Sequence, residues 1–347
     1  MNKQRLPMGL SSPVDDSLCM ETRTRLAQAS REPQAGSVTV SAPCTTANLG
    51  PGFDVFGLAL DAFHDTVQIW SASVGGVMLE VSGAESWNVP RDPDLNSAGL
   101  VAKHLLSQIE AHVGLRIRLE KKIPVGKGLG SSAASAAATA VGLNRLLGLE
   151  LTVNELVEAA AHGETASAGA PHADNVAAAI LGGFTFVQSY APLSVAGFAP
   201  PRGLEVAIAV PEIPTPLNKT ELARAVLPDN VALGKIAQNV GGAASIVAGV
   251  LSEDIGLIGK GMVDTIVEPA RAKLVPGYGE VRRAALKAGA EGVAISGAGP
   301  SMIAIVNCAR VSAAAVAEAM KQAFESAGVE CRALTSRPAR GATVLKE

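Results

Sequence analysis

Residues 124–140 read PVGKGLGSSAASAAATA, and this stretch predicts a glycine-rich turn that opens a helix. Three glycines fall within five positions: Gly126, Gly128 and Gly130. Glycines at that density let backbone N–H groups approach a ligand closely. Either Ser131 or Ser132 can cap the helix, which the following alanine run favours. Because a helix N-terminus carries partial positive charge and orphan N–H donors, the stretch predicts a phosphate-binding loop.

Two familiar phosphate loops do not match this spacing. A Walker A loop ends in Gly-Lys-Ser/Thr, whereas Lys127 precedes the second glycine here. The dinucleotide-binding fingerprint requires a glycine three positions after the second one, and that position is Ser131. A glycine turn before an ordinary packing helix is the alternative, because such turns are common.

The composition limits the class of protein. The chain has 347 residues, 48% of them hydrophobic, which is enough for a core and suggests two domains. A net charge of −3, no basic run and 3% aromatic residues argue against nucleic-acid binding. No apolar run reaches membrane-spanning length, so no membrane contact is expected. Four cysteines without a Cys-x-x-Cys pair favour a reducing compartment, which we take to be the cytoplasm.

Residues 1–36 differ in character from the rest of the chain. They are polar, mix both signs of charge and show no sustained period, which predicts a disordered N-terminal extension. Acidic residues among the arginines are atypical of transit peptides, so a plastid presequence is the lesser alternative. The remainder divides into an N-terminal domain at residues 37–195 and a C-terminal domain at residues 196–347. A proline-bearing link is expected at residues 189–201.

Hydrophobic periodicity predicts short strands and amphipathic helices throughout the ordered part. Strands are expected at residues 38–42, 67–70, 77–81, 115–119, 184–187, 206–210, 293–296 and 302–306. Helices are expected from the glycine loop to near Gly148, up to Ile180, and at residues 96–112, 219–226, 235–251, 281–289 and 313–327. Thr152 and Glu155 predict a capping box for one further helix. The mixture predicts an α/β (α+β) fold.

Several polar side chains lie in turns where a binding site is plausible on chemical grounds. Asn48 and Asp54 belong to a glycine-proline turn, although both are ordinary turn residues. Glu164 lies in a polar segment, and a lone Glu near a phosphate loop suits magnesium, with the hydroxyl of Ser132 as a second ligand. The segment lacks His-Glu-x-x-His spacing, so zinc is not expected.

The same segment ends in His172, Asp174 and Asn175, for which capping of a helix N-terminus is the alternative explanation. Arg224 and Arg271 each offer a planar fork that binds a carboxylate or phosphate at two points. A solvated surface arginine is the alternative for either one. No Gly-x-Ser-x-Gly nucleophile elbow is present.

Three turns taken together resemble the signature motifs of the GHMP small-molecule kinases. They are ANLGPGFD at residues 47–54, PVGKGLGSSAAS at residues 124–135 and SGAGPS at residues 296–301. The resemblance runs from about residue 37 to the end of the chain. The segments ANLGPGFDVFGLALD, HADNVAAAILGGF and IVEPARAKLVPGY are most similar to the branch of that family that phosphorylates homoserine.

This resemblance implies a two-domain kinase with a ribosomal-S5-like N-terminal domain and a ferredoxin-like C-terminal domain. It implies ATP phosphates on a loop comprising Val125, Gly126, Lys127, Gly128, Leu129, Gly130, Ser131, Ser132, Ala133, Ala134 and Ser135. It implies Mg²⁺ on Ser132 and Glu164. The implied contacts to L-homoserine are Asn48, Asp54, His172, Asn175, Thr220, Arg224 and Arg271.

The chemistry of those residue types agrees with an amino-acid substrate. The two arginines would hold its carboxylate, Asp54 its ammonium group, and Asn175 its hydroxyl. Asn cannot accept a proton at neutral pH, so the interpretation is in-line transfer without a dedicated protein base, with Ser132, Glu164 and Asn175 as the catalytic group. The alternative is that the preceding residue, Asp174, acts as a protein base. Lys127, where the family often has a small residue, would add charge near the phosphates.

The expected function is therefore ATP-dependent phosphorylation of the homoserine side-chain hydroxyl, a step toward threonine, by an expected homodimer. One alternative is another GHMP kinase, such as one acting on mevalonate. A second alternative, from a different class, is a catalytically silent protein of this fold that binds metabolites as a regulator. The intact motifs and the residues Ser132 and Glu164 argue against the silent protein.

Overall fold

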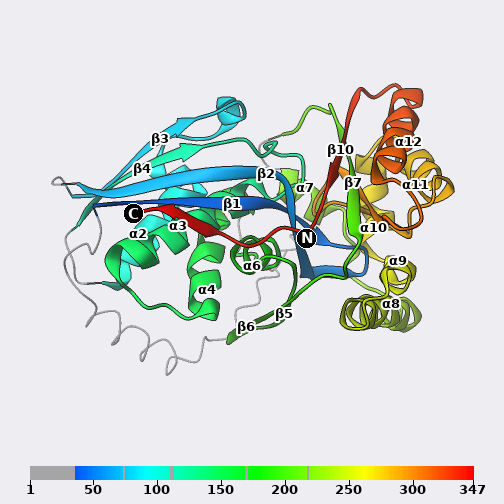
Figure 1. Ribbon diagram of the computed structural model, residues 1–347, viewed down its shortest axis with the longest axis horizontal. Helices are drawn as coiled ribbons and strands as arrows, with labels where there is room; N and C mark the ends of the chain where they lie inside the picture. Colours follow the sequence, from blue (N-terminus) through cyan, green and yellow to red (C-terminus); the bar gives the residue numbers. More distant parts are fainter. Residues whose placement is uncertain (1–35, 73–74, 110–112, 169–170, 217–218) are drawn as a thin grey trace, which may run out of the picture.

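The computed structural model describes residues 36–72, 75–109, 113–168, 171–216 and 219–347 (Figure 1). The predicted N-terminal extension, apart from residue 36, lies outside the described residues. Two sheets organise the chain, one for each half, and the glycine loop lies where the two halves meet. The mixed α/β class predicted from periodicity is confirmed.

The first sheet has seven strands. Its main path runs in the order β11 (Thr343–Lys346), β1 (Ser37–Asn48), β2 (Gly52–Ala72), β4 (Gly114–Glu120) and β3 (Val77–Ser82). The hairpin of β5 (Phe184–Tyr190) and β6 (Leu193–Phe198) pairs with the start of β2. All pairs are antiparallel except β3 with β4. Strand β11, from the end of the chain, thus returns to the sheet of the first half.

Helix α3 (Ser131–Leu147) is the centre of the first half. It packs against β1 and β2 and against three further helices, α2 (Ser97–Gln108), α4 (Val153–Gly163) and α6 (Asp174–Leu181). Thirteen of its 17 residues are buried. Small residues allow this close packing, because a Cβ at Gly142 would already lie 2.9 Å from Ile69 Cδ1. The alanine run of α3 therefore serves packing as well as helix propensity.

The second sheet has the order β10 (Cys331–Ser336), β7 (Leu204–Pro211), β9 (Met302–Asn307) and β8 (Gly292–Ile295), with every pair antiparallel. Along the chain the second half reads strand, helices, strand, strand, helix, strand. With the spatial order 4-1-3-2, this is the ferredoxin-like arrangement expected for the C-terminal half. The helices are α7 (Lys219–Ala225), α8 (Leu233–Leu251), α9 (Ile255–Gly261), α10 (Val267–Arg271), α11 (Tyr278–Lys287) and α12 (Ala313–Ser326).

Most predicted elements are present, and the differences have a physical cause. The strand predicted at residues 67–70 is part of the 21-residue β2, in which residues 56–60 are buried in one continuous run and gave no period-two signal. The link predicted at residues 189–201 is wrong, because residues 193–198 form β6. The predicted boundary between residues 195 and 196 falls inside that strand, and the division into folding domains stays a prediction. Short elements such as α5 (Thr165–Ala168) and the edge strand β11 went unpredicted.

The described part of the chain holds no helix that combines the length and apolar character needed to cross a membrane.

Candidate active site

The three glycine turns meet at one place between the two sheets. Asn48 Nδ2 donates to Gly297 O at 3.0 Å, which joins the first turn to the third. Ser296 Oγ donates to Gly128 O at 2.7 Å, which joins the third turn to the second. A cavity of about 1000 Å³ opens beside all three turns. Motifs separated by more than 200 positions in the sequence therefore line one site.

The glycine loop combines left-handed backbone with close packing. Gly128 and Gly130 have φ values of +83° and +67°. A Cβ at Gly130 would overlap the hydroxyl of Thr45, and one at Gly128 would overlap the carbonyl oxygen of Ser296. The loop therefore needs glycine both for its conformation and because neighbouring groups leave no room for a side chain.

Helix α3 begins at this loop without a side-chain cap, and the expectation that Ser131 or Ser132 supplies one is wrong. Ser131 Oγ donates instead to Ile123 O at 3.2 Å, and Ser132 Oγ donates to Glu164 Oε2 at 3.0 Å. Among the described residues, no side chain accepts from the first-turn N–H groups as a cap. Those donors and the helix dipole suit an anion, as predicted for a phosphate-binding loop.

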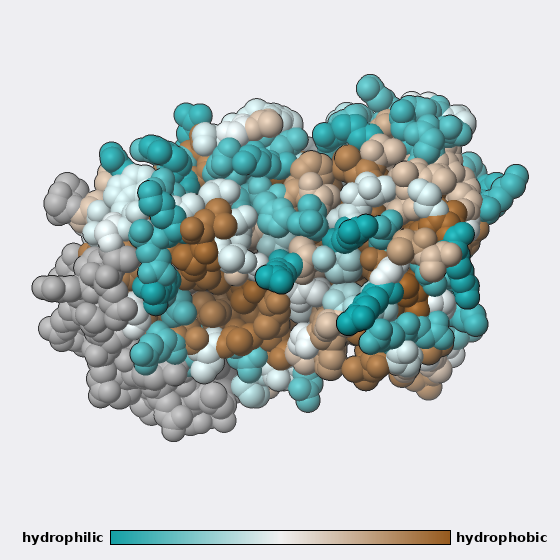
Figure 2. Space-filling model, viewed as in Figure 1, coloured by the Kyte–Doolittle hydropathy of each residue, from teal (hydrophilic) through white to brown (hydrophobic). Residues whose placement is uncertain are grey.

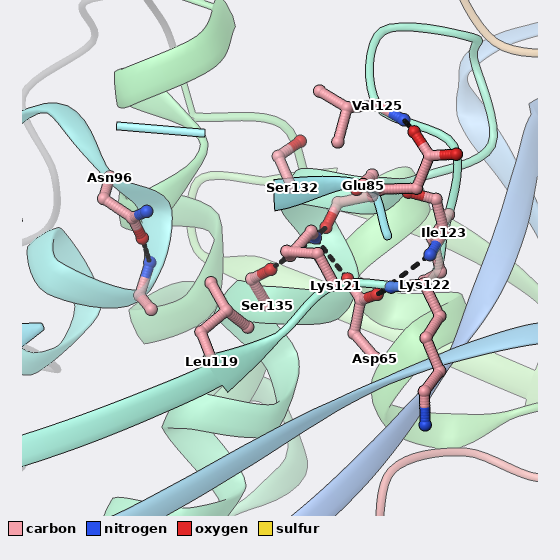
Figure 3. Close-up of polar contacts among 12 residues, drawn as sticks. Asp65, Glu85, Asn96, Leu119, Lys121, Lys122, Ile123, Val125, Ser132 and Ser135 are labelled. Atoms are coloured by element: carbon pink, nitrogen blue, oxygen red, sulfur yellow. Dashed lines mark hydrogen bonds and ion pairs between the residues drawn. The ribbon is translucent and has the colours of Figure 1, made fainter. Parts of the chain in front are cut away.

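A buried lysine forms hydrogen bonds to the same end of α3 (Figure 3). Lys121 Nζ forms an ion pair with Asp65 and donates to Ser131 O at 2.7 Å and to Ser135 Oγ at 2.8 Å. The other carboxylate oxygen of Asp65 accepts from the backbone of Ile123 at 3.0 Å. Sequence reasoning missed this pair, because nothing in the LEKKIP segment distinguishes buried Lys121 from its exposed neighbour.

Glu164 meets Ser132 beside the loop, as required for a shared ion. Burial raises the pKa of Glu164 to about 7, the nearby Asp174 adds to the rise, and the hydrogen bond from Ser132 opposes it. Within the described ranges no three His, Cys, Asp or Glu residues gather as a metal site. A carboxylate and a hydroxyl nonetheless fit Mg²⁺, which takes hard oxygen ligands and is commonly held by one or two carboxylates plus substrate phosphates.

Asp174 and Asn175 begin α6 and face the same cavity. Asn175 Oδ1 accepts from Thr45 Oγ1 at 2.7 Å, and its Nδ2 donates to Asp174 Oδ1 at 3.3 Å. Burial, followed by the charge of Asp54, raises the pKa of Asp174 to about 6. The amide of Asn175 is thus held in a fixed orientation by two neighbours.

The other wall of the cavity carries two arginines on one aromatic ring. The guanidinium carbons of Arg224 and Arg271 each lie 5.2 Å from the ring centroid of Phe53. Arg224 Nη2 donates to Asp54 Oδ2 at 2.6 Å and lies 3.2 Å from His172 Nδ1. Arg224 and Asp54, predicted to bind opposite ends of a substrate, therefore pair with each other here. Phe53 was missed, although it lies within the first motif.

Two buried donors on this wall have no partner within the described residues: Arg224 Nε and His172 Nε2. Burial and then the charge of Arg224 lower the pKa of His172, which keeps the ring neutral near pH 7. Because Nδ1 faces the guanidinium donor, we assign the ring proton to Nε2. Unpaired buried donors are costly, and an anionic group such as a carboxylate would satisfy both.

Arg271 is committed in part to the protein itself. Its Nε donates to Ala223 O at 3.0 Å and its Nη1 to Gly297 O at 3.1 Å. The side chain also lines the cavity, as does Thr220. Arg271 therefore positions α7 and the third turn, and only the rest of its fork faces the cavity.

Two lysines near the loop have contacts that the sequence did not predict. Lys127 Nζ donates to Pro211 O at 2.9 Å and to Ile213 O at 3.1 Å, so its charge is directed to the second half of the chain. Lys219 Nζ donates to Gly299 O at 2.5 Å. That carbonyl oxygen would lie 2.7 Å from a Cβ on Gly128, which places the Lys219 ammonium beside the glycine loop. Burial, and then the charges of Arg271 and Lys127, lower the pKa of Lys219 to about 7.

The rim of the cavity near the loop is apolar. Trp87, 78% exposed, and Leu95, 61% exposed, both line the cavity together with Val89 and Pro90. Exposed large hydrophobic side chains at a cavity mouth are typical of a ligand-binding surface. Sequence reasoning missed this rim, because Trp87 and Leu95 lie in two short 3₁₀ turns, and these turns and the residues between them give no periodic signal.

Comparison with known proteins places these features in context. The sequence matches the families described as GHMP kinases N terminal domain, at residues 96–183, and GHMP kinases C terminal, at residues 246–326. It is 42% identical to the homoserine kinase of Halorubrum lacusprofundi and 45% identical to that of Natronomonas pharaonis, over 89% of this chain and 100% of each relative. It is similar to the crystal structure of homoserine kinase from Cytophaga hutchinsonii, with a TM-score of 0.82 and 37% identity over 90% of this chain and 98% of that chain.

We expect the substitution Asp65→Asn to lower the free energy of unfolding by about 3–5 kcal/mol, because it leaves the ammonium of Lys121 buried without its counter-charge. Nucleotide affinity should fall with it, since Lys121 holds the start of α3. Urea unfolding and calorimetric titration measure the two effects.

The matched control for this experiment is Glu80→Gln, which removes an exposed partner of Arg118. It should change the free energy of unfolding by less than about 1 kcal/mol. Equal small effects of the two substitutions would contradict a structural role for the buried pair.

Proposed function

This chain belongs to the GHMP kinase family, and we propose that it is a homoserine kinase that transfers the γ-phosphoryl group of ATP to the side-chain hydroxyl of L-homoserine. The observation that carries the proposal is the pairing of two anion sites in one cavity. One is the uncapped N-terminus of α3 behind the glycine loop, and the other is the pair of arginines on Phe53. ATP phosphates suit the first, and an amino-acid carboxylate suits the second.

The nucleotide end of the cavity is built for a polyphosphate with a purine attached. First-turn N–H groups of α3 and the ammonium of Lys219 would contact the phosphates. The apolar rim with Trp87 and Leu95 offers a surface for the base. Ser132 and Glu164 would hold Mg²⁺, which when bound neutralises phosphate charge and aligns the γ-phosphate.

The acceptor end matches an amino acid in both charge and spacing. Arg224 and Asp54 present opposite charges side by side, with 2.6 Å between Nη2 and Oδ2. A zwitterion presents the complementary pair, with its carboxylate toward Arg224 and His172 and its ammonium toward Asp54. A substrate with a carboxylate but no ammonium group would leave Asp54 without that contact.

Transfer itself needs alignment more than a strong base. A bond forms between the homoserine oxygen and the γ-phosphorus while the bond to the β–γ bridging oxygen breaks, and ADP leaves. Because the transition state is loose, the homoserine hydroxyl need not lose its proton before the transfer begins. The proton can pass to the transferred phosphoryl group. Asn175, held by Thr45 and Asp174, would orient the hydroxyl. Asp174 acting as base is the alternative within this proposal.

The other functions considered from the sequence are less well supported. Both curated relatives compared above are named homoserine kinases, which argues against a mevalonate-type kinase. The contact between Ser132 and Glu164 beside an uncapped helix end argues against a silent metabolite-binding protein. Magnesium dependence, a step in threonine synthesis and a cytoplasmic location stay part of the proposal.

An acceptor panel tests the proposed function. Coupled measurement of ADP release with homoserine, mevalonate, galactose and no acceptor should give turnover with homoserine at least about a hundredfold above the others. Equal rates with mevalonate would contradict the substrate assignment. No acceptor-dependent release at all, in a protein that binds ATP, would favour the silent metabolite-binding protein.

We expect Glu164→Gln to lower kcat by at least about a hundredfold at saturating Mg²⁺, because the ion loses its charged ligand while the side-chain shape is kept. Glu158→Gln, on the exposed side of α4, the helix that ends just before Glu164, is the control and should retain wild-type kcat. Activity of the Glu164 variant within a few-fold of wild type would show that Glu164 is not a ligand.

The same variant tests the raised pKa of Glu164. Folding carries no cost from this carboxyl below its ordinary value of 4.5, and stability is lost as pH rises toward the folded value of about 7. Without Mg²⁺, Glu164→Gln should therefore melt a few degrees above wild type at pH 8 and close to wild type at pH 4. A lower melting temperature at pH 8 would contradict the burial argument.

We expect Arg224→Lys to raise the KM for homoserine about ten- to a hundredfold and to leave ATP affinity unchanged, because charge-assisted hydrogen bonds from the planar fork are lost. Homoserinol, in which a hydroxymethyl group replaces the carboxylate, should distinguish little between wild type and variant. Steady-state kinetics with both acceptors measures this difference. An equal loss with homoserinol would remove Arg224 from the carboxylate site.

A further inference from the structure

The turn that carries Asp54 has a backbone conformation that most residues avoid. Asn48, Leu49 and Asp54 have φ values of +72°, +49° and +57°. Residues other than glycine rarely adopt this left-handed region, and its cost in free energy is tolerated only where surrounding contacts fix the backbone. The position of the Asp54 carboxylate therefore depends on the groups that bind the backbone of this turn.

Hydrogen bonds hold the backbone of Asp54 on both sides. Its N–H donates to Asn48 Oδ1 at 3.1 Å, which is a contact within the turn. Its carbonyl oxygen accepts from the hydroxyl of Tyr190 at 2.6 Å, and Tyr190 lies 136 positions later in the chain. A hydrogen bond that spans this distance in sequence ties the turn to a separate element. The hydroxyl of Tyr190 therefore restrains the peptide that carries the Asp54 carboxylate.

Tyr190 is the last residue of β5, at the turn of the hairpin that β5 forms with β6. Apolar contacts anchor this hairpin, since Phe184 is buried and the rings of Phe186 and Phe198 stack with centroids 5.7 Å apart. Figure 2 shows hydrophobic residues in the region where Figure 1 places α6 and the hairpin. An anchored hairpin gives the tyrosine hydroxyl a fixed position against Asp54.

The hydroxyl of Tyr190 also lies close to the start of α6. Burial is the main reason that the pKa of Tyr190 is raised, and the charges of Asp174 and Asp54 add to the rise. A hydrogen bond with the backbone of Ala173, which immediately precedes α6, opposes it. Tyr190 itself does not line the cavity, whereas Asp54 and Asp174 do. Any effect of Tyr190 on a substrate must therefore pass through these neighbours.

We propose that Tyr190 is a positioning residue for the acceptor, and that its hydroxyl holds Asp54 in the place where Asp54 binds the substrate ammonium group. This role rests on the proposed function, because the ammonium group is that of homoserine. Without the hydroxyl, the carbonyl oxygen of Asp54 loses its partner and the left-handed backbone is free to relax. The carboxylate would then move away from the ammonium group, while other contacts hold the glycine loop and the start of α3.

The substitution Tyr190→Phe removes the hydroxyl and keeps the ring. It should raise the KM for homoserine about three- to tenfold, because one hydrogen bond is lost, and leave kcat and the KM for ATP within about twofold of wild type. The inhibition constant of 4-hydroxybutyrate, which is homoserine without its amino group, should be the same for both proteins. An unchanged KM for homoserine would overturn the positioning role, and an equal loss of affinity for 4-hydroxybutyrate would overturn its action through Asp54.

The matched control is Tyr278→Phe, which removes the hydroxyl of the other tyrosine in the chain. That hydroxyl donates to Glu268 Oε2 at 3.0 Å, and neither residue lines the cavity. Tyr278→Phe should keep the wild-type KM for homoserine, and a rise equal to that of Tyr190→Phe would overturn the specific role of Tyr190. Absence of homoserine turnover by wild type would instead contradict the proposed function, and the positioning role would fall with it.

A double-mutant cycle tests whether Tyr190 acts through Asp54. Asp54→Asn removes the charge, and Asn tolerates the left-handed backbone of this position. In that background Tyr190→Phe should raise the KM for homoserine by less than about twofold, because the contact that Tyr190 positions is already weakened. A rise as large as in wild type would overturn the proposal, whatever the effect of either substitution alone.

Discussion

The ion pair between Lys121 and Asp65 is the interaction on which the site depends. Both side chains are buried, so neither charge is tolerated without the other. Lys121 follows the last residue of β4 and holds the first turn of α3 through Ser131 and Ser135. Asp65 binds the backbone just before the glycine loop. The sheet thereby fixes the direction in which the N–H groups of α3 face the cavity.

The cavity brings together buried charged and polar groups. Burying each of them costs free energy until a bound substrate supplies a counter-charge or a hydrogen-bond partner. Burial raises the pKa of Glu164 and of Asp174, and it lowers the pKa of Lys219. His172 and Arg224 each carry a buried donor that has no partner in the described residues. Phosphates, a divalent cation and a zwitterionic amino acid would supply the missing counter-charges. Electrostatic groups fixed in advance of binding are what phosphoryl transfer requires, because its chemistry depends on positioning and charge stabilisation.

The parts of the site that depend on residues close together in the chain could be predicted from the sequence. The glycine loop, the helix that follows it and the capping box at Thr152 depend on neighbours in the chain, and all three are present. The sequence did not predict which lysine of the LEKKIP segment is buried, the ring of Phe53 between two arginines, or Lys219 beside the loop. Those roles arise from contacts across the two sheets, which no local pattern records. The roles assigned to individual substrate-binding residues stay predictions.

The most direct test of the central claim is a crystal structure with a non-hydrolysable ATP analogue, Mg²⁺ and homoserine. We predict that the phosphates lie at the N-terminus of α3, that the ion lies on Ser132 and Glu164, and that homoserine binds with its carboxylate on Arg224 and its hydroxyl facing the γ-phosphate. A nucleotide bound away from the glycine loop, or homoserine bound with its carboxylate away from the arginines on Phe53, would contradict it.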